Sequence, residues 1–159
     1  MQKIVKIPTE QEAYNKYAAL CARQECCQHD LAEKMLRKGM SEMAVAHVLQ
    51  QLVEEGFIDE ARFSKAFVHE KFEFSRWGKI RIQLELKHKK IPTDYIKAAL
   101  EEIDEQEYMK HLKSLLEDYK RTAKAKSAYE LRYKLMRYAY SRGFEQHLAS
   151  IVVEDMVSL

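Results

Sequence analysis

The chain has 159 residues, a formal net charge of +2 and 47% hydrophobic residues. That length is enough to bury the core of one domain, whereas no apolar run approaches the ~18 residues that span a bilayer. The N-terminus carries no signal-peptide pattern, and three clustered cysteines, Cys21, Cys26 and Cys27, do not form a disulfide framework. We therefore expect a cytoplasmic protein without disulfides or a membrane partner.

Strong helix formers dominate the composition, which includes only two prolines and four glycines. Strand signals are almost missing, so the sequence predicts an all-α protein. The one β-like stretch, Ile4 to Ile7, is short and precedes Pro8. Residues 1–9 are therefore expected to form an extended N-terminal lead-in.

Three segments of the sequence, residues 31–52, 82–103 and 135–156, align without a gap at offsets of 51 and 53. Apolar residues recur at seven matched positions, and their spacing places them on one face of each of two successive helices. The matched sets are Leu31, Ile82 and Leu135; Met35, Leu86 and Ala139; Met40, Ile91 and Phe144; Val45, Ile96 and Ala149; Val48, Ala99 and Val152; Leu49, Leu100 and Val153; and Leu52, Ile103 and Met156. This pattern predicts a repeated structural unit.

A leading helix precedes each pair, because Thr9, Asp59 and Asp104 stand where N-caps are expected. Gly39 and Gly143 mark the turn between the second and third helices, while Pro92 helps to break the helix in the middle unit. The expected units are residues 10–57, 58–103 and 104–159. Three tandem three-helix repeats of this kind predict an elongated, curved array.

Charge is distributed unevenly along the chain. Residues 25–60 contain eight acids and three Lys or Arg, whereas residues 119–142 contain eight Lys or Arg and a single acid, Glu130. The segment 76–91 carries six Lys or Arg against one acid, Glu85. Such asymmetry suits a polyanionic partner, although solvated helix faces explain it equally well.

No catalytic or metal-binding constellation is recognisable. The histidines are scattered, no pair of cysteines has the CxxC spacing of a zinc site, and no phosphate-binding loop or nucleophile elbow is present. The cysteines fit buried or helix-capping thiols, with Cys27 at a cap position. We therefore expect no metal, no cofactor and no small-molecule substrate, but a protein that binds other macromolecules.

Aromatic residues leave two interpretations open. Trp77 is either part of the core or an exposed interface anchor. Four tyrosines in the third unit interleave with arginines and lysines, which suits either a nucleic-acid surface or the wet edge of a core. They are Tyr129, Tyr133, Tyr138 and Tyr140.

The stretch "IDEARFSKAFVHEKFEFSRWGKIRIQLELKHKKI", residues 58–91, resembles the signature of the RecX family of bacterial regulators of the RecA recombinase. The closing "KLMRYAYSRGFEQHLASIVVED" and the opening "LCARQECCQHDLAEKMLRKG" resemble further motifs of that family. The matching structural positions are Asp59, Arg62, Phe63, Gly78, Ile82, Gly143 and Phe144. Departures are Cys27 in place of a capping Ser, Lys90 in place of Gly, and Ala139 with Tyr140 in place of a Leu-rich pair.

The resemblance implies tandem three-helix repeats and a non-enzymatic regulator. Such a regulator would modulate recombination, DNA repair and the SOS response through RecA. RecX-like proteins bind the filament of RecA on single-stranded DNA and inhibit ATP hydrolysis, strand exchange and coprotease activity. A monomer is expected. The candidate contacts to RecA or DNA are Arg76, Lys79, Arg81, Lys87, Lys89, Lys90, Lys120, Arg121, Lys124, Lys126, Arg132, Arg137 and Arg142. The alternatives are a direct nucleic-acid-binding repeat protein without a RecA partner, and a helical scaffold that recruits peptides.

Within residues 76–91, Ile80, Ile82 and Leu86 are expected to point into the core. The cations of this stretch are expected on the surface, because an isolated buried charge is prohibitively costly. Together with the basic residues of 120–137 they are predicted to form one basic surface over two units.

Overall fold

A computed structural model describes residues 6–158, which form nine α-helices and no strand. The helices are α1 (Glu10–Arg23), α2 (Gln28–Arg37), α3 (Glu42–Glu54), α4 (Glu60–Glu73), α5 (Lys79–His88), α6 (Thr93–Glu101), α7 (Glu105–Thr122), α8 (Ala128–Ser141) and α9 (Gln146–Met156). Residues 6–9 precede α1 without regular secondary structure, and the rest of the predicted lead-in, residues 1–5, lies outside the described residues.

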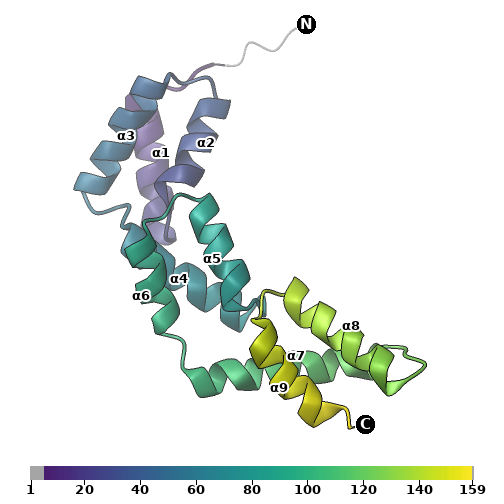
Figure 1. The fold of residues 1–159 in the computed structure, drawn as a ribbon. Coiled ribbons are helices and arrows are strands. Elements are labelled where there is room, and N and C mark those ends of the chain that lie inside the picture. Colours follow the sequence, from purple (N-terminus) through teal and green to yellow (C-terminus); the bar gives the residue numbers. More distant parts are fainter. Residues whose placement is uncertain (1–5, 159) are drawn as a thin grey trace, which may run out of the picture.

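The helices pack mainly within three consecutive trios. We name α1–α3 unit 1, α4–α6 unit 2 and α7–α9 unit 3. Figure 1 shows the units one after another along a line that bends between unit 2 and unit 3. The predicted all-α array of three tandem three-helix repeats, elongated and curved, is confirmed.

Each unit begins with a capped helix, as the sequence indicates. The Thr9 hydroxyl accepts the Glu12 backbone N–H and the Glu12 carboxylate accepts the Thr9 N–H, which completes a capping box. Asp59 and Asp104 likewise accept the backbone N–H three residues ahead, at 3.0 Å in each case. These bonds satisfy donors that the first helical turn leaves without partners.

The turn between the second and third helices of each unit has the same backbone conformation. Gly39, Lys90 and Gly143 all have positive φ, at 91°, 58° and 94°. The left-handed region ends a helix at little cost for glycine and at about 1–2 kcal/mol for other residues. Lys90 therefore occupies a strained position that glycine fills in the other two units.

The matched apolar positions form the core. Leu31, Ile82 and Leu135 are at most 1% exposed, and Met35, Leu86 and Ala139 are completely buried. Unit 1 has a core cluster of its own, whereas units 2 and 3 share one continuous cluster. Cys27, at the start of α2, packs into the shared cluster instead of the core of its own unit. None of the helices in the described part of the chain has the length and apolar character needed to cross a bilayer.

Candidate functional site

Helix α5 links all three units, because each of its ends contacts a neighbour. At its N-terminus, the Gly78 and Ile80 backbone N–H groups donate to the carbonyls of Arg142 and Gly143 in unit 3, at 2.8 and 2.9 Å. At the residue after its C-terminus, the Lys89 ammonium contacts both carboxylate oxygens of Asp30 in unit 1, at 2.9 and 2.8 Å. The most basic helix of unit 2 is therefore held between two junctions.

The two faces of α5 differ as expected, with one correction. Ile82 and Leu86 are fully buried. Ile80 is 39% exposed, so the prediction that it points inward is wrong. Two residues correspond to about 200° around a helix, so Ile80 lies on nearly the opposite side from Ile82.

Trp77 stands just before α5 and is half-buried against the shared core. The Arg81 guanidinium lies 4.0 Å from the centroid of its ring and the Lys71 ammonium 4.9 Å. The tryptophan therefore packs on the core, as one of its two expected roles requires, and its ring also holds two cations of the same chain by cation–π attraction.

Six of the thirteen basic candidates have partners within the protein. Arg76 and Arg121 both pair with Asp118, at 2.9 and 3.4 Å, and Lys89 pairs with Asp30. The other three donate to backbone carbonyls: Lys120 to Met156, Arg132 to Val157 and Arg142 to Ser75. These side chains hold the fold together, which reduces their availability to a partner.

The remaining candidates divide into two kinds. Three lie over aromatic rings: Lys79 over Tyr108, Arg81 over Trp77 and Arg137 over Tyr133. Four are exposed and, among the described residues, have no ion-pair partner: Lys87, Lys90, Lys124 and Lys126. The structure separates these four into two places. Lys87 and Lys90 flank Lys89 at the C-terminal end of α5, where Lys89 contacts unit 1. Lys124 and Lys126 belong to the loop between α7 and α8, which Figure 1 shows on the side of unit 3 away from unit 1.

The residues that match the family motifs have structural positions. Asp59 caps α4, and Arg62 donates to Glu25 of unit 1 at 2.5 Å and to the Gly56 carbonyl at 3.2 Å. Phe63, Ile82 and Phe144 are core residues. Gly78 and Gly143 face each other across the junction of units 2 and 3, where a Cβ on Gly78 would lie 2.3 Å from the Gly143 oxygen.

A polar network at the same junction could not be recognised from the sequence. The Tyr108 hydroxyl donates to the Glu145 carboxylate at 2.5 Å and accepts the Lys79 backbone N–H at 3.0 Å. Burial, followed by the hydrogen bond to Glu145, raises the pKa of Tyr108 well above its ordinary value. The tyrosine therefore stays neutral and joins α7, α5 and the start of α9. The one available signal was the position of Tyr108 four residues after Asp104, as Phe63 follows Asp59.

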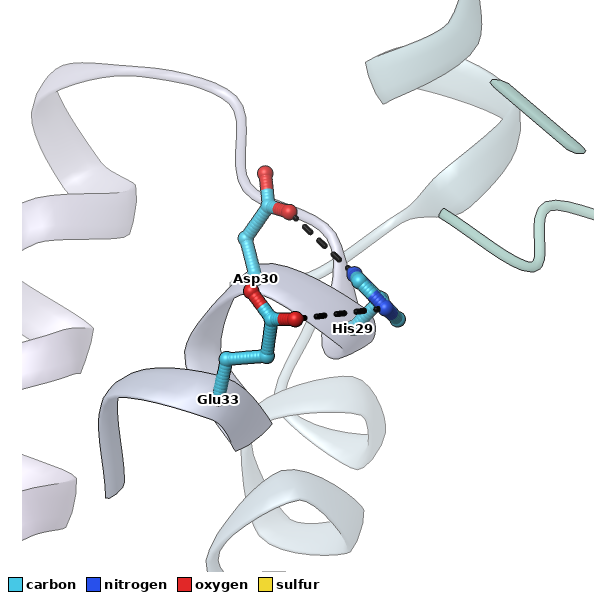
Figure 2. A group of neighbouring side chains, drawn as sticks. All are labelled: His29, Asp30 and Glu33. Atoms are coloured by element: carbon cyan, nitrogen blue, oxygen red, sulfur yellow. Dashed lines mark hydrogen bonds and ion pairs between the residues drawn. The ribbon is translucent and has the colours of Figure 1, made fainter. Parts of the chain in front are cut away.

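His29, Asp30 and Glu33 form the one group in the described chain whose ligand atoms are close enough to be considered for a metal ion. Figure 2 shows that the two carboxylates address different ring nitrogens: Asp30 lies 3.4 Å from Nδ1 and Glu33 3.7 Å from Nε2. A single ion coordinates only one of these nitrogens. Lys89 also occupies both oxygens of Asp30. The arrangement is therefore a polar network in which Asp30 and Lys89 form the ion pair.

The pKa values at this network show how its charges are balanced. Burial raises the pKa of Asp30, but the hydrogen bonds and the charge of Lys89 outweigh burial and hold it below its ordinary value. Burial lowers the pKa of Lys89, and Asp30 more than compensates and raises it. Both groups are therefore charged at neutral pH, and together they connect unit 1 to unit 2.

Sequence comparisons match two of the three units to domains of a known family. The sequence model described as "RecX, second three-helix domain" matches residues 59–100, and "RecX, third three-helix domain" matches residues 105–153. Regulatory protein RecX of Geobacillus thermodenitrificans is 25% identical over 155 residues, which cover 98% of this chain and 58% of that protein. Regulatory protein RecX of Mycobacterium sp. (strain KMS) is 26% identical over 148 residues, or 91% and 81% of the two chains. The chain thus spans about three-fifths of the length of the Geobacillus relative.

Solved structures show the same fold. The crystal structure of RecX from Lactobacillus salivarius superposes with a TM-score of 0.77 and 16% identity, and covers 92% of this chain and 96% of that chain. A second structure, of a regulatory protein RecX, gives a TM-score of 0.81 and 18% identity, with 90% and 72% coverage. The likeness extends over nearly the whole array.

Proposed function

This chain belongs to the RecX family, and from that membership we propose that it is a non-enzymatic regulator of the RecA recombinase. In this proposal it binds the filament that RecA forms on single-stranded DNA, in the cytoplasm. Binding there inhibits ATP hydrolysis, strand exchange and coprotease activity, and so moderates recombination and DNA repair. The match of units 2 and 3 to the second and third RecX domains is the observation that carries the proposal.

The form of the array supports binding to a long, regular partner. Three stacked units present an elongated surface (Figure 1), and a helical filament offers repeated contact sites along its length. Several weak contacts made by one array reinforce one another through effective concentration. The array can therefore bind a filament much more tightly than any single unit does.

The distribution of charge supports binding to a filament that contains DNA. Lys87 and Lys90 on unit 2, and Lys124 and Lys126 on unit 3, are exposed. Residues 25–60, which include most of unit 1 after α1, carry an acidic excess. Basic groups of units 2 and 3 can approach phosphates or acidic protein surfaces, while unit 1 can approach basic ones. Such complementarity fixes orientation and increases the rate of association.

A test of the proposal measures ATP hydrolysis by RecA on single-stranded DNA while this protein is added. We expect hydrolysis to fall as the protein is titrated in. The triple variant Lys87→Glu, Lys124→Glu, Lys126→Glu should inhibit much more weakly, because all three side chains are exposed and surface changes cost within about 0.5 kcal/mol of stability each.

The matched control is Lys16→Glu, Lys34→Glu, Lys38→Glu, which makes the same change in net charge on exposed positions of unit 1. We expect this control to inhibit as well as wild type does, or better. Full-strength inhibition by the first variant would show that these cations are only solvated side chains. If the wild-type protein does not inhibit RecA, the proposed function is wrong.

A further inference from the structure

Three tyrosines form an exposed stripe along α8. Tyr129, Tyr133 and Tyr140 are 78%, 56% and 63% exposed. Their spacings of four and seven residues place them within about 40° of one another around the helix. We call these three residues the tyrosine stripe.

The tyrosine stripe does not cover the edge of the core. Tyr138, on the other side of α8, has that role: its ring stacks on Tyr119 with centroids 4.2 Å apart and planes 12° apart, and it packs against the shared core. Within the described chain, the hydroxyls of the tyrosine stripe have no hydrogen-bond partner. Three large rings are thus left facing solvent on one side of a single helix, an arrangement that marks interaction sites more often than it serves stability.

Positive charge borders the tyrosine stripe. The Arg137 guanidinium lies 5.8 Å from the centroid of the Tyr133 ring. Arg137 also lines a shallow groove between α7 and α8 together with Lys134, Tyr119, Tyr138 and Ser141. The one acid on this helix, Glu130, is occupied by the Lys126 backbone N–H at 2.9 Å and the Lys134 ammonium at 3.2 Å. Negative charge therefore does not oppose an anion along this face.

We propose that this face of α8 binds single-stranded DNA directly, with the tyrosine stripe stacking on bases while Arg137 contacts phosphates. Exposed rings beside a basic groove are the combination that single-strand-binding surfaces use, because every base offers a π-face to a ring. A duplex keeps its bases stacked on each other and cannot use the rings in this way. An acidic protein surface would engage the cations and leave the three rings without a partner. The inference deepens the proposed function, on which it rests for the choice of DNA.

The test uses the full chain, without RecA, and measures the fluorescence anisotropy of a labelled oligothymidylate. The variant Tyr129→Ala, Tyr133→Ala, Tyr140→Ala removes the rings, and Tyr129→Phe, Tyr133→Phe, Tyr140→Phe keeps them. We expect the alanine variant to bind at least about 100-fold more weakly, since each stacked ring contributes about fivefold or more. The phenylalanine variant should bind within about twofold of wild type, because stacking needs only the ring.

An abasic oligonucleotide of the same length separates base stacking from phosphate attraction. It should bind wild type weakly, and the alanine variant should bind it equally weakly. The proposal is overturned if the alanine variant keeps wild-type affinity for oligothymidylate, or if wild type binds the abasic strand as tightly. Circular dichroism establishes that each variant is folded, which the exposure of the three side chains leads us to expect.

RecA inhibition, measured separately, distinguishes this inference from the proposed function. Inhibition of RecA by a protein that does not bind oligothymidylate would overturn the inference and leave the proposed function standing. Base-dependent DNA binding without RecA inhibition would do the opposite. If the alanine variant keeps its DNA affinity but loses binding to DNA-free RecA, the tyrosine stripe is a protein contact and the inference fails.

Discussion

Replacing Gly78 by alanine tests whether units 2 and 3 are held together by direct backbone contact. A Cβ at this position would lie 2.3 Å from the Gly143 oxygen and 2.5 Å from the Phe144 nitrogen, closer than non-bonded atoms approach. The backbone of Gly78 has φ −81° and ψ 168°, which any residue adopts without strain. The cost of the substitution must therefore come from forcing the two units apart.

The contacts across the junction of units 2 and 3 determine how much stability the substitution removes. Three backbone N–H groups donate across this junction: Gly78 to the Arg142 carbonyl, Ile80 to the Gly143 carbonyl and Lys79 to the Tyr108 hydroxyl. Each contributes about 1 kcal/mol to stability, and overpacking adds about 1–3 kcal/mol. We expect Gly78→Ala to lower the free energy of unfolding by about 4–6 kcal/mol. Separation of unit 3 should also make the transition less cooperative.

Urea unfolding followed by circular dichroism measures this loss, and Gly56→Ala is the matched control. Gly56 has φ 79°, but no atom lies within 4 Å of the place that a Cβ would take, so its substitution costs only the backbone strain of about 1–2 kcal/mol. The reasoning is refuted if Gly78→Ala is as stable as Gly56→Ala. That result would mean that the junction tolerates a methyl group and that its backbone bonds contribute little.

Two further predictions concern titratable side chains. Because its pKa in the folded protein lies below the ordinary 3.8, Asp30 stabilises the fold fully above pH 3.8, and this contribution is lost as the pH falls through the folded-state pKa. Asp30→Asn should therefore lower the free energy of unfolding by about 1–3 kcal/mol at pH 7. In urea unfolding, the difference between this variant and wild type should shrink below pH 3.8, and a constant difference would contradict the prediction. Burial raises the pKa of the Cys27 and Cys21 thiols to about 12. At pH 8 the native protein should therefore react with a thiol reagent far more slowly than the urea-unfolded chain. Rapid reaction of the native protein would show that these sites open easily.

The core and the helix ends could be predicted because both depend on neighbours in the sequence. A repeat of apolar residues at helical spacing fixes which face is buried, and Leu31, Ile82 and Leu135 are buried as predicted. Caps act over three residues, and Asp59 and Asp104 cap their helices as predicted. The error at Ile80 has the same local basis, since its position relative to Ile82 already placed it on the other face.

The partners of the charged residues could not be predicted, because they depend on how whole units are placed. Lys89 meets Asp30 across 59 positions of sequence, and Arg76 meets Asp118 across 42. No periodicity within a helix indicates such pairs. The tyrosines of α8 show the same limit, since only the packing separates Tyr138 from the three exposed rings.

The repeat shows that the first junction, between units 1 and 2, and the second junction, between units 2 and 3, are held by different contacts. At offsets of 51 and 53, Cys27 and Lys90 at the first junction correspond to Gly78 and Gly143 at the second. With side chains at those positions, the first junction is closed by polar side chains, such as Lys89 with Asp30 and Arg62 with Glu25.

The second junction cannot use the same pair, because the positions of Asp30 and Lys89 are taken there by Arg81 and Arg142. Two cations cannot form an ion pair, so Arg81 stacks on Trp77 while Arg142 donates to the Ser75 carbonyl. The two glycines bring the backbones into hydrogen-bonding contact instead. Salt screens an ion pair that is partly open to solvent, but it has little effect on backbone hydrogen bonds between neutral groups. Units 2 and 3 therefore share one core and direct backbone hydrogen bonds, whereas unit 1 is joined to them by ion pairs and by Cys27, which packs into that core.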